Sequence, residues 1–237
     1  MKKSIVFCIV SLLAAPLLAA DSSPKDDVTS AAKKLGDSAN YTWHTTVIVP
    51  ESSQFTPGPT DGKTEKGGIT YVKQSFGDNT MEFAKKGTAV AYTDQDGNWQ
   101  AMSTNTDTAG GGGRGRFGGG MMARNFKTPD AQAADLAAAA KSLTKDGDVY
   151  SGDLTDDGAK SFLAMGGRRG GAPTVTNPSG SVKFWITDGM LTKYELKVKG
   201  TVSFNGNDRD IDRDTTVEIK DVGKTTVDAP DAAKKLL

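Results

Sequence analysis

Residues 181–199 read SVKFWITDGMLTKYELKVK, and this stretch decides the fold. Apolar and polar side chains alternate on both sides of Asp188-Gly189, a residue pair that tolerates the positive φ of a tight hairpin turn. One face collects the apolar positions Val182, Phe184, Ile186, Tyr194, Leu196 and Val198. The charged side chains of 193–199 fall on the other face. The stretch therefore predicts an antiparallel hairpin with one buried and one solvated face.

The same alternation predicts more strands on either side of this hairpin. Tyr41, Trp43 and Val47 share one face of an expected strand at 41–49. Further β-prone runs lie at 68–76, 80–86, 88–93 and 98–102 and around 217–219. The segment 51–67 contains prolines and little that is apolar, so we expect an exposed loop there. Consecutive antiparallel strands are the simplest arrangement of these runs.

Three other segments have helical signatures. Apolar residues recur at helical spacing in 28–35, directly before Gly36. Thr128 and Pro129 begin an alanine-rich run that we expect to remain helical to about 143. Thr155 is the expected N-cap of a helix at 156–163. Strands and helices in this order predict an α+β protein.

The N-terminus has the pattern of a secretory signal peptide. Lys2 and Lys3 precede an uncharged apolar run that reaches Ala20 and is followed by Asp21. This run is shorter than the roughly 20 residues of a membrane-spanning helix, and no stop-transfer pattern follows it. We therefore expect residues 1–20 to be removed and the processed chain, 21–237, to work as a single soluble domain in the periplasm or as a secreted protein, without a membrane span.

Processing also removes the one cysteine, Cys8, so the mature chain would have no disulfide and no thiolate metal site. The whole chain has 29 basic and 29 acidic residues, and loss of Lys2 and Lys3 leaves a small acidic excess. Such a balance provides no bulk attraction for nucleic acid, and we expect no nucleic-acid partner.

Two inserts, at 109–120 and 165–180, are rich in glycine and arginine. They bury too little apolar surface to offset their ordering entropy, so we expect them to be flexible. Residues 113–118 match the G-x-G-x-x-G pattern of dinucleotide sites, but that site requires a parallel βαβ unit, which the hairpin pattern excludes. The arginines could instead contact phosphate or sulfate groups of an envelope lipid or glycan, or be solvated.

Catalytic and metal-binding patterns are weak. His44 is the single histidine, and no G-x-S-x-G motif accompanies it. The acidic residues of 208–214 alternate as in a calcium loop, but Arg213 stands where that loop requires glycine. We expect no enzyme activity, no metal and no cofactor.

Several segments together resemble the periplasmic lipoprotein-carrier superfamily, which includes the Lol-type carrier. They are 41–43 (YTW), 96–99 (DGNW), the helices within 131–163, 184–189 (FWITDG) and 217–223 (VEIKDVG). The resemblance implies a strongly curved antiparallel sheet, an incomplete barrel closed by helices, with an apolar cavity for acyl chains between sheet and helices.

The expected fold is therefore α+β, with a single strongly curved antiparallel sheet covered by a few helices. As a hypothesis, its concave face lines a pocket for a lipid or other hydrophobic ligand. The residues of this hypothesis are Tyr41, Trp43, Val47, Phe184, Ile186, Tyr194, Leu196 and Val198. The expected function is non-catalytic binding or carriage of that ligand. The alternative is a non-catalytic envelope interaction module with a filled core that docks a protein or glycan partner.

Overall fold

The computed structural model describes residues 22–51, 53, 56–77, 79–102, 119–164, 173–204 and 206–237. The strands of these residues are β1 (Asn40–Ile48), β2 (Thr60–Glu65), β3 (Thr70–Phe76), β4 (Asn79–Lys86), β5 (Ala89–Thr93), β6 (Trp99–Ala101), β7 (Thr144–Asp146), β8 (Val149–Asp153), β9 (Thr174–Thr187), β10 (Met190–Phe204) and β11 (Asn207–Lys220). The helices are α1 (Pro24–Gly36), α2 (Gly119–Asn125), α3 (Pro129–Ala139), α4 (Asp156–Leu163) and α5 (Asp231–Lys234).

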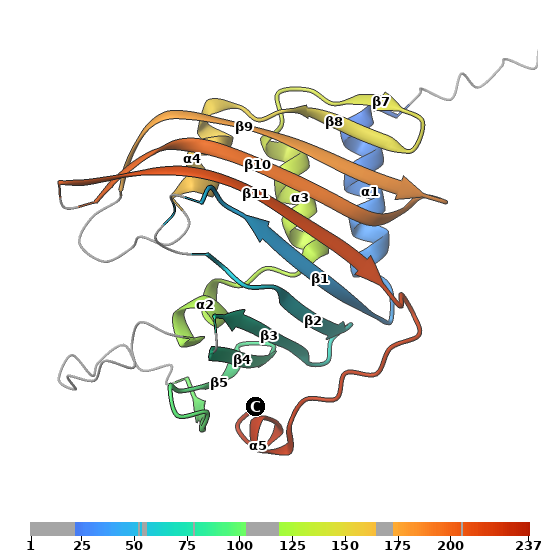
Figure 1. The fold of residues 1–237 in the computed structure, drawn as a ribbon. Helices are drawn as coiled ribbons and strands as arrows, with labels where there is room; N and C mark the ends of the chain where they lie inside the picture. The colour runs from blue at the N-terminus through green and yellow to red at the C-terminus, as the bar shows by residue number, and fades with distance from the viewer. Residues whose placement is uncertain are drawn as a thin grey trace, which may run out of the picture.

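All of these strands belong to one antiparallel sheet with the order β6-β5-β4-β3-β2-β1-β11-β10-β9-β8-β7 (Figure 1). Two meanders, β1 to β6 and β7 to β11, are joined where β1 pairs with β11 and places Trp43 opposite Ile219. The sheet remains open, because β6 and β7 are its two ends. The prediction of a single open, curved antiparallel sheet with a few helices is confirmed.

The hairpin predicted for residues 181–199 is also present. Phe184 pairs with Tyr194 and Val182 pairs with Leu196 across β9 and β10. Asp188 and Gly189 both have positive φ, at 53° and 69°, as the turn requires. The alternation of apolar and polar residues therefore predicted both strands of this hairpin and their buried face.

Helices α1 to α4 cover one face of the sheet, which we call the inner face (Figure 1). Helix α1 begins with a capping box, in which the Ser23 hydroxyl accepts a hydrogen bond from the Asp26 backbone, and buries the predicted apolar stripe. Thr155 caps α4 as expected, since its hydroxyl accepts from the Gly158 N–H at 3.0 Å. Helix α5 packs on the opposite, outer face, where Ala233 meets Ala84 and Ala91. None of the described helices is long and apolar enough to span a membrane.

The segment 51–67 differs from the sequence prediction. The expected loop at 51–67 contains β2, which pairs with both β1 and β3. Its inward positions carry Thr60, Gly62 and Thr64 instead of large apolar residues, so hydrophobic alternation gave no signal there.

The two glycine- and arginine-rich inserts are shorter than predicted at one end. Helix α2 begins within the insert at 109–120, and β9 begins at Thr174, within the insert at 165–180. Strand pairing of 174–180 with β10 overrides the weak local preference of this stretch. Residues 109–118 and 165–172, like the expected signal peptide at 1–20, lie outside the described residues.

Candidate functional site

The inner face has two separate helical covers. Helices α1 and α4 pack on β9 and β10, with α3 alongside α1, while α2 packs on β4 and β5. The strands between these covers, β11, β1, β2 and β3, have their main contacts with neighbouring strands of the sheet. We call the region over these four strands the helix gap.

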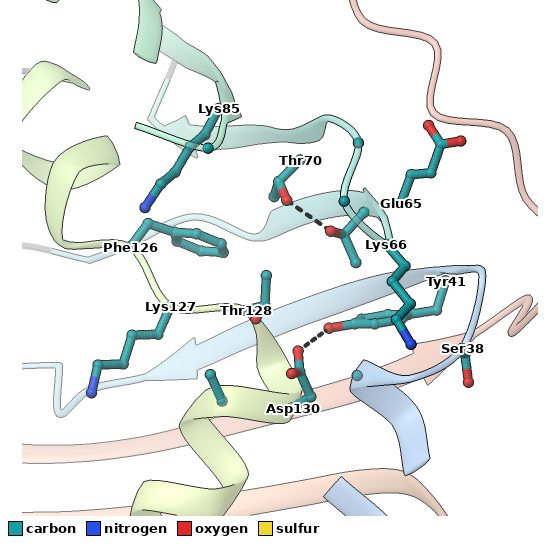
Figure 2. Close-up of a pocket in the computed structure, with 16 residues that line it drawn as sticks. Ser38, Tyr41, Glu65, Lys66, Thr70, Lys85, Phe126, Lys127, Thr128 and Asp130 are labelled. Carbon is teal, nitrogen blue, oxygen red and sulfur yellow. Dashed lines mark hydrogen bonds between the residues drawn. The ribbon is translucent and has the colours of Figure 1, made fainter. Parts of the chain in front are cut away.

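A pocket of about 470 Å³ lies at one end of the helix gap. Its walls come from the end of α1, the start of β1, the β2–β3 and β4–β5 turns and the connection between α2 and α3 (Figure 2). Tyr41, Thr64, Lys85, Phe126 and Asp130 are among the lining residues. The pocket therefore lies where three parts of the chain meet, namely 36–41, 64–87 and 126–131.

The apolar side of the pocket is an aromatic cluster. Phe126, from the α2–α3 connection, stacks on Trp43 with ring centroids 5.9 Å apart and an interplanar angle of 19°. It also meets Phe83 edge-on at 5.1 Å, and Trp43 lies 5.8 Å from Tyr41. Trp43 and Phe83 are buried, whereas Phe126 remains partly exposed. Phe126 thus separates the pocket from the buried aromatic floor of the helix gap.

The polar side is organised by Asp130 in the first turn of α3. The Tyr41 hydroxyl donates a hydrogen bond to Asp130 Oδ1 at 2.6 Å, as Figure 2 shows. Burial raises the pKa of Tyr41, and the negative charge of Asp130 raises it further, so the phenol remains a neutral donor at physiological pH. Deeper in, the Tyr194 hydroxyl donates to Gln132 Oε1 at 2.5 Å. Burial, reinforced by Asp130, likewise raises the pKa of Tyr194.

Three lysines surround the pocket mouth. Lys66 pairs with Asp37 at 3.0 Å, and Lys127 pairs with Asp135. Lys85 forms no ion pair with any carboxylate in the described ranges. The site therefore combines an aromatic floor with a rim of cationic and hydroxyl groups, an arrangement suited to an amphiphile.

The residues predicted from the sequence fall into two groups. Tyr41 lines the pocket, Trp43 lies beside it in the aromatic cluster, and Val47 is half-buried further along the inner face of β1. The other group packs in the continuous core with α1, α3 and α4 and consists of Phe184, Ile186, Tyr194, Leu196 and Val198. Their role in ligand binding stays a prediction.

Sequence reasoning missed three residues of the site, Lys85, Phe126 and Asp130. Lys85 shares the inner face of β4 with Phe83 but is polar, and the other two lie outside the strands, so hydrophobic alternation could not group them. Phe126 did offer one signal, because it is the single aromatic residue between 118 and 149.

His44 lies away from this site, on the outer face of the sheet. Its Nδ1 is 2.7 Å from Asp61 Oδ1 on the neighbouring strand, and both side chains are partly exposed. Across the described ranges, no group of three His, Cys, Asp or Glu side chains is placed to hold a metal ion.

Replacing Tyr41 with phenylalanine is expected to lower the free energy of unfolding by about 1.5 kcal/mol, because the hydrogen bond to the Asp130 carboxylate is lost in a partly buried setting. Chemical denaturation of both proteins measures the difference. Tyr92→Phe is the matched control, because no described residue bonds the Tyr92 hydroxyl, and it should change the value by less than about 0.5 kcal/mol. Equal effects at the two positions would contradict the assignment.

Comparison with known proteins gives structural matches only. No family model matches the sequence, and no curated protein matches it. Among solved structures, the chain is similar to lipoprotein LppX of Mycobacterium tuberculosis, with a TM-score of 0.46 and 6% identity over 86% of this chain and 97% of that one. It is also similar to LprF of Mycobacterium bovis, with a TM-score of 0.44 and 12% identity over 90% and 100% of the two chains.

A third match is a LolA superfamily protein of Nitrosomonas europaea, with a TM-score of 0.35 and 12% identity over 91% of this chain and 98% of that one.

Proposed function

We propose that this protein binds an amphiphilic ligand, a lipid or another molecule with an apolar chain, in the helix gap and carries it without catalysis. The observation that supports this most directly is the pocket between the two helical covers, with Phe126 and Trp43 beside it and lysines at its mouth. Its volume of about 470 Å³ lies within the usual range of small-molecule sites, roughly 300–1,000 Å³. The signal-peptide pattern of residues 1–20 supports a place of action in the periplasm or outside the cell.

Binding would depend on burial of the apolar chain. Each methylene removed from water contributes about 0.8 kcal/mol. A chain that extends beyond the pocket would have to displace Phe126, which is held at the edge of the aromatic cluster by two ring contacts. Phe126 is therefore the side chain we expect to move when a long chain enters.

The pocket can be blocked at Ala131, a lining residue in the first half of α3. Ala131→Trp is expected to weaken binding of the neutral fluorescent probe N-phenylnaphthylamine about tenfold or more, because the indole would occupy the space that the probe needs. Fluorescence titration gives the dissociation constant, and thermal melting confirms that the variant is folded.

The matched control is Ala138→Trp, the same change at an exposed position of the same helix. It should leave the probe affinity within about twofold of the wild type. Undiminished binding by the folded Ala131→Trp variant would rule out this pocket as the binding site.

The packed core under α1, α3 and α4 favours a second candidate. Phe184, Tyr194 and Val198 are at most 1% exposed, so that half of the inner face is already filled. A filled interior fits a non-catalytic interaction module that docks an envelope protein or glycan. Native mass spectrometry of the protein purified from its own envelope separates the two: a co-purifying amphiphile supports the carrier, and consistently empty protein supports the module.

A further inference from the structure

Arg213 lies on the inner face of the sheet, among apolar side chains. On β11 it shares this face with Val217 and Ile219, both buried, and it pairs with the fully buried Val198 on β10. The flanking acids do not share this face. Asp212 and Asp214 face outward, where they pair with Lys199 at 2.8 Å and with Lys197.

The guanidinium of Arg213 is shielded but poorly partnered. One Nη donates a long hydrogen bond of 3.4 Å to the Phe162 carbonyl, in the last turn of α4. Its Nε is buried, and nothing in the described ranges accepts a hydrogen bond from it. No carboxylate of these ranges forms an ion pair with the side chain. Burial lowers the pKa of Arg213, yet a guanidinium stays protonated in proteins.

A half-buried cation without a carboxylate partner is less favourable than one that an anion joins. Burying a charge without a partner costs free energy, and an unused N–H donor adds to that cost. Contact with the negative end of the α4 dipole offsets part of it. That contact uses a single donor at long distance, whereas a planar guanidinium can bind a carboxylate or phosphate through two parallel hydrogen bonds.

The location of Arg213 connects it with the helix gap. Val47 on β1 pairs with Thr215, which lies two residues from Arg213 on the same face. From Tyr41 at the pocket to Val47, the inner face of β1 extends for about 20 Å, at roughly 3.3 Å per residue. The aromatic pocket and the half-buried Arg213 therefore lie toward opposite ends of one stretch of inner face.

We propose that Arg213 binds an oxyanion, a carboxylate or phosphate, and that this group is the head group of the amphiphile whose chain occupies the helix gap. The second half of this statement rests on the proposed function. It makes the ligand an anionic amphiphile and assigns its polar end to the region between β11 and the end of α4.

The test compares palmitate, hexadecanol and inorganic phosphate as competitors of N-phenylnaphthylamine and as stabilisers in thermal melting. The wild-type protein should bind palmitate about tenfold more tightly than hexadecanol, because only palmitate offers a charged acceptor. Arg213→Met should bind both equally, at the affinity of the wild type for hexadecanol. Arg209→Met, which removes the same charge from an exposed position of the same strand, should keep the tenfold preference.

Phosphate identifies the source of the oxyanion. Stabilisation by palmitate alone assigns the site to a lipid head group. Stabilisation by phosphate at similar concentrations, lost in Arg213→Met, assigns it to a free oxyanion. If neither palmitate nor hexadecanol binds the wild type, the proposed function fails while the phosphate comparison still tests Arg213.

Three results would overturn the proposal: equal palmitate and hexadecanol affinities in the wild type without any phosphate effect, a preference that survives Arg213→Met, or equal loss in Arg209→Met. Without ligand, Arg213→Met should melt no lower than the wild type, since a half-buried charge without a carboxylate partner is removed. A lower melting temperature together with no anion effect would make Arg213 a structural cap of α4.

Arg213→Lys, which keeps the charge but not the planar fork, should retain part of the preference for palmitate. It provides a second variant if methionine prevents folding.

Discussion

Replacing Phe184 with alanine is expected to lower the free energy of unfolding by about 3–5 kcal/mol. The side chain is fully buried on β9, where it pairs with Tyr194 on one side and Tyr150 on the other. Its ring centroid lies 6.4 Å from that of Tyr194. Truncation removes the transfer free energy of the ring and leaves a cavity that the surrounding sheet and helices can close only in part. Urea denaturation of the two proteins measures the difference.

Lys183→Ala is the control for this change, because Lys183 is the preceding residue on β9 and is exposed on the outer face. It should alter stability by no more than about 0.5 kcal/mol. A loss below about 1.5 kcal/mol for Phe184→Ala, together with altered amphiphile binding, would mean that Phe184 borders an open cavity instead of a packed core. The experiment thus tests the sequence hypothesis that Phe184 lines the ligand site.

The strands could be predicted wherever one face of the sheet is apolar. In β9 and β10 the side chains alternate with a period of two, and a shift of one residue would turn the whole apolar set toward solvent. The same reasoning grouped Tyr41, Trp43 and Val47 on β1. Helix ends followed from local chemistry, as at Thr155, whose hydroxyl satisfies a free N–H of α4.

The candidate site could not be predicted in the same way, because its residues come from different kinds of element that are distant in sequence. Lys85 is the penultimate residue of β4, Phe126 follows α2, and Asp130 lies in the first turn of α3. Only tertiary packing brings them together. In the sequence, Arg213 stands out only as the residue that breaks the calcium-loop pattern. Its role in the structure depends instead on the face of β11 that it occupies.

Strand β2 shows why a small residue can determine a site that hydrophobic patterns do not reveal. Gly62 pairs with Trp43 on β1 and with Val72 on β3, so it belongs to the inner face of the helix gap. A Cβ atom at this position would lie 1.9 Å from Cζ2 of Trp43. The indole therefore lies directly over the glycine, and the missing side chain gives the aromatic cluster its room.

Gly62→Val is accordingly expected to lower the free energy of unfolding by about 3 kcal/mol, because the indole must leave its position or the strands must separate. Displacement of Trp43 would also disturb its stacking on Phe126, so binding of N-phenylnaphthylamine should weaken in the same variant. Denaturation and probe titration measure the two effects.

A double-mutant cycle identifies the cause. In a Trp43→Leu background the steric conflict is largely absent and valine suits a strand, so Gly62→Val should there change stability by less than about 1 kcal/mol. The difference between the two backgrounds, about 2 kcal/mol, is the coupling between residues 43 and 62. If Gly62→Val were equally destabilising with and without the indole, the strain would arise from the β2 backbone, and Trp43 could not be the side chain that occupies this part of the helix gap.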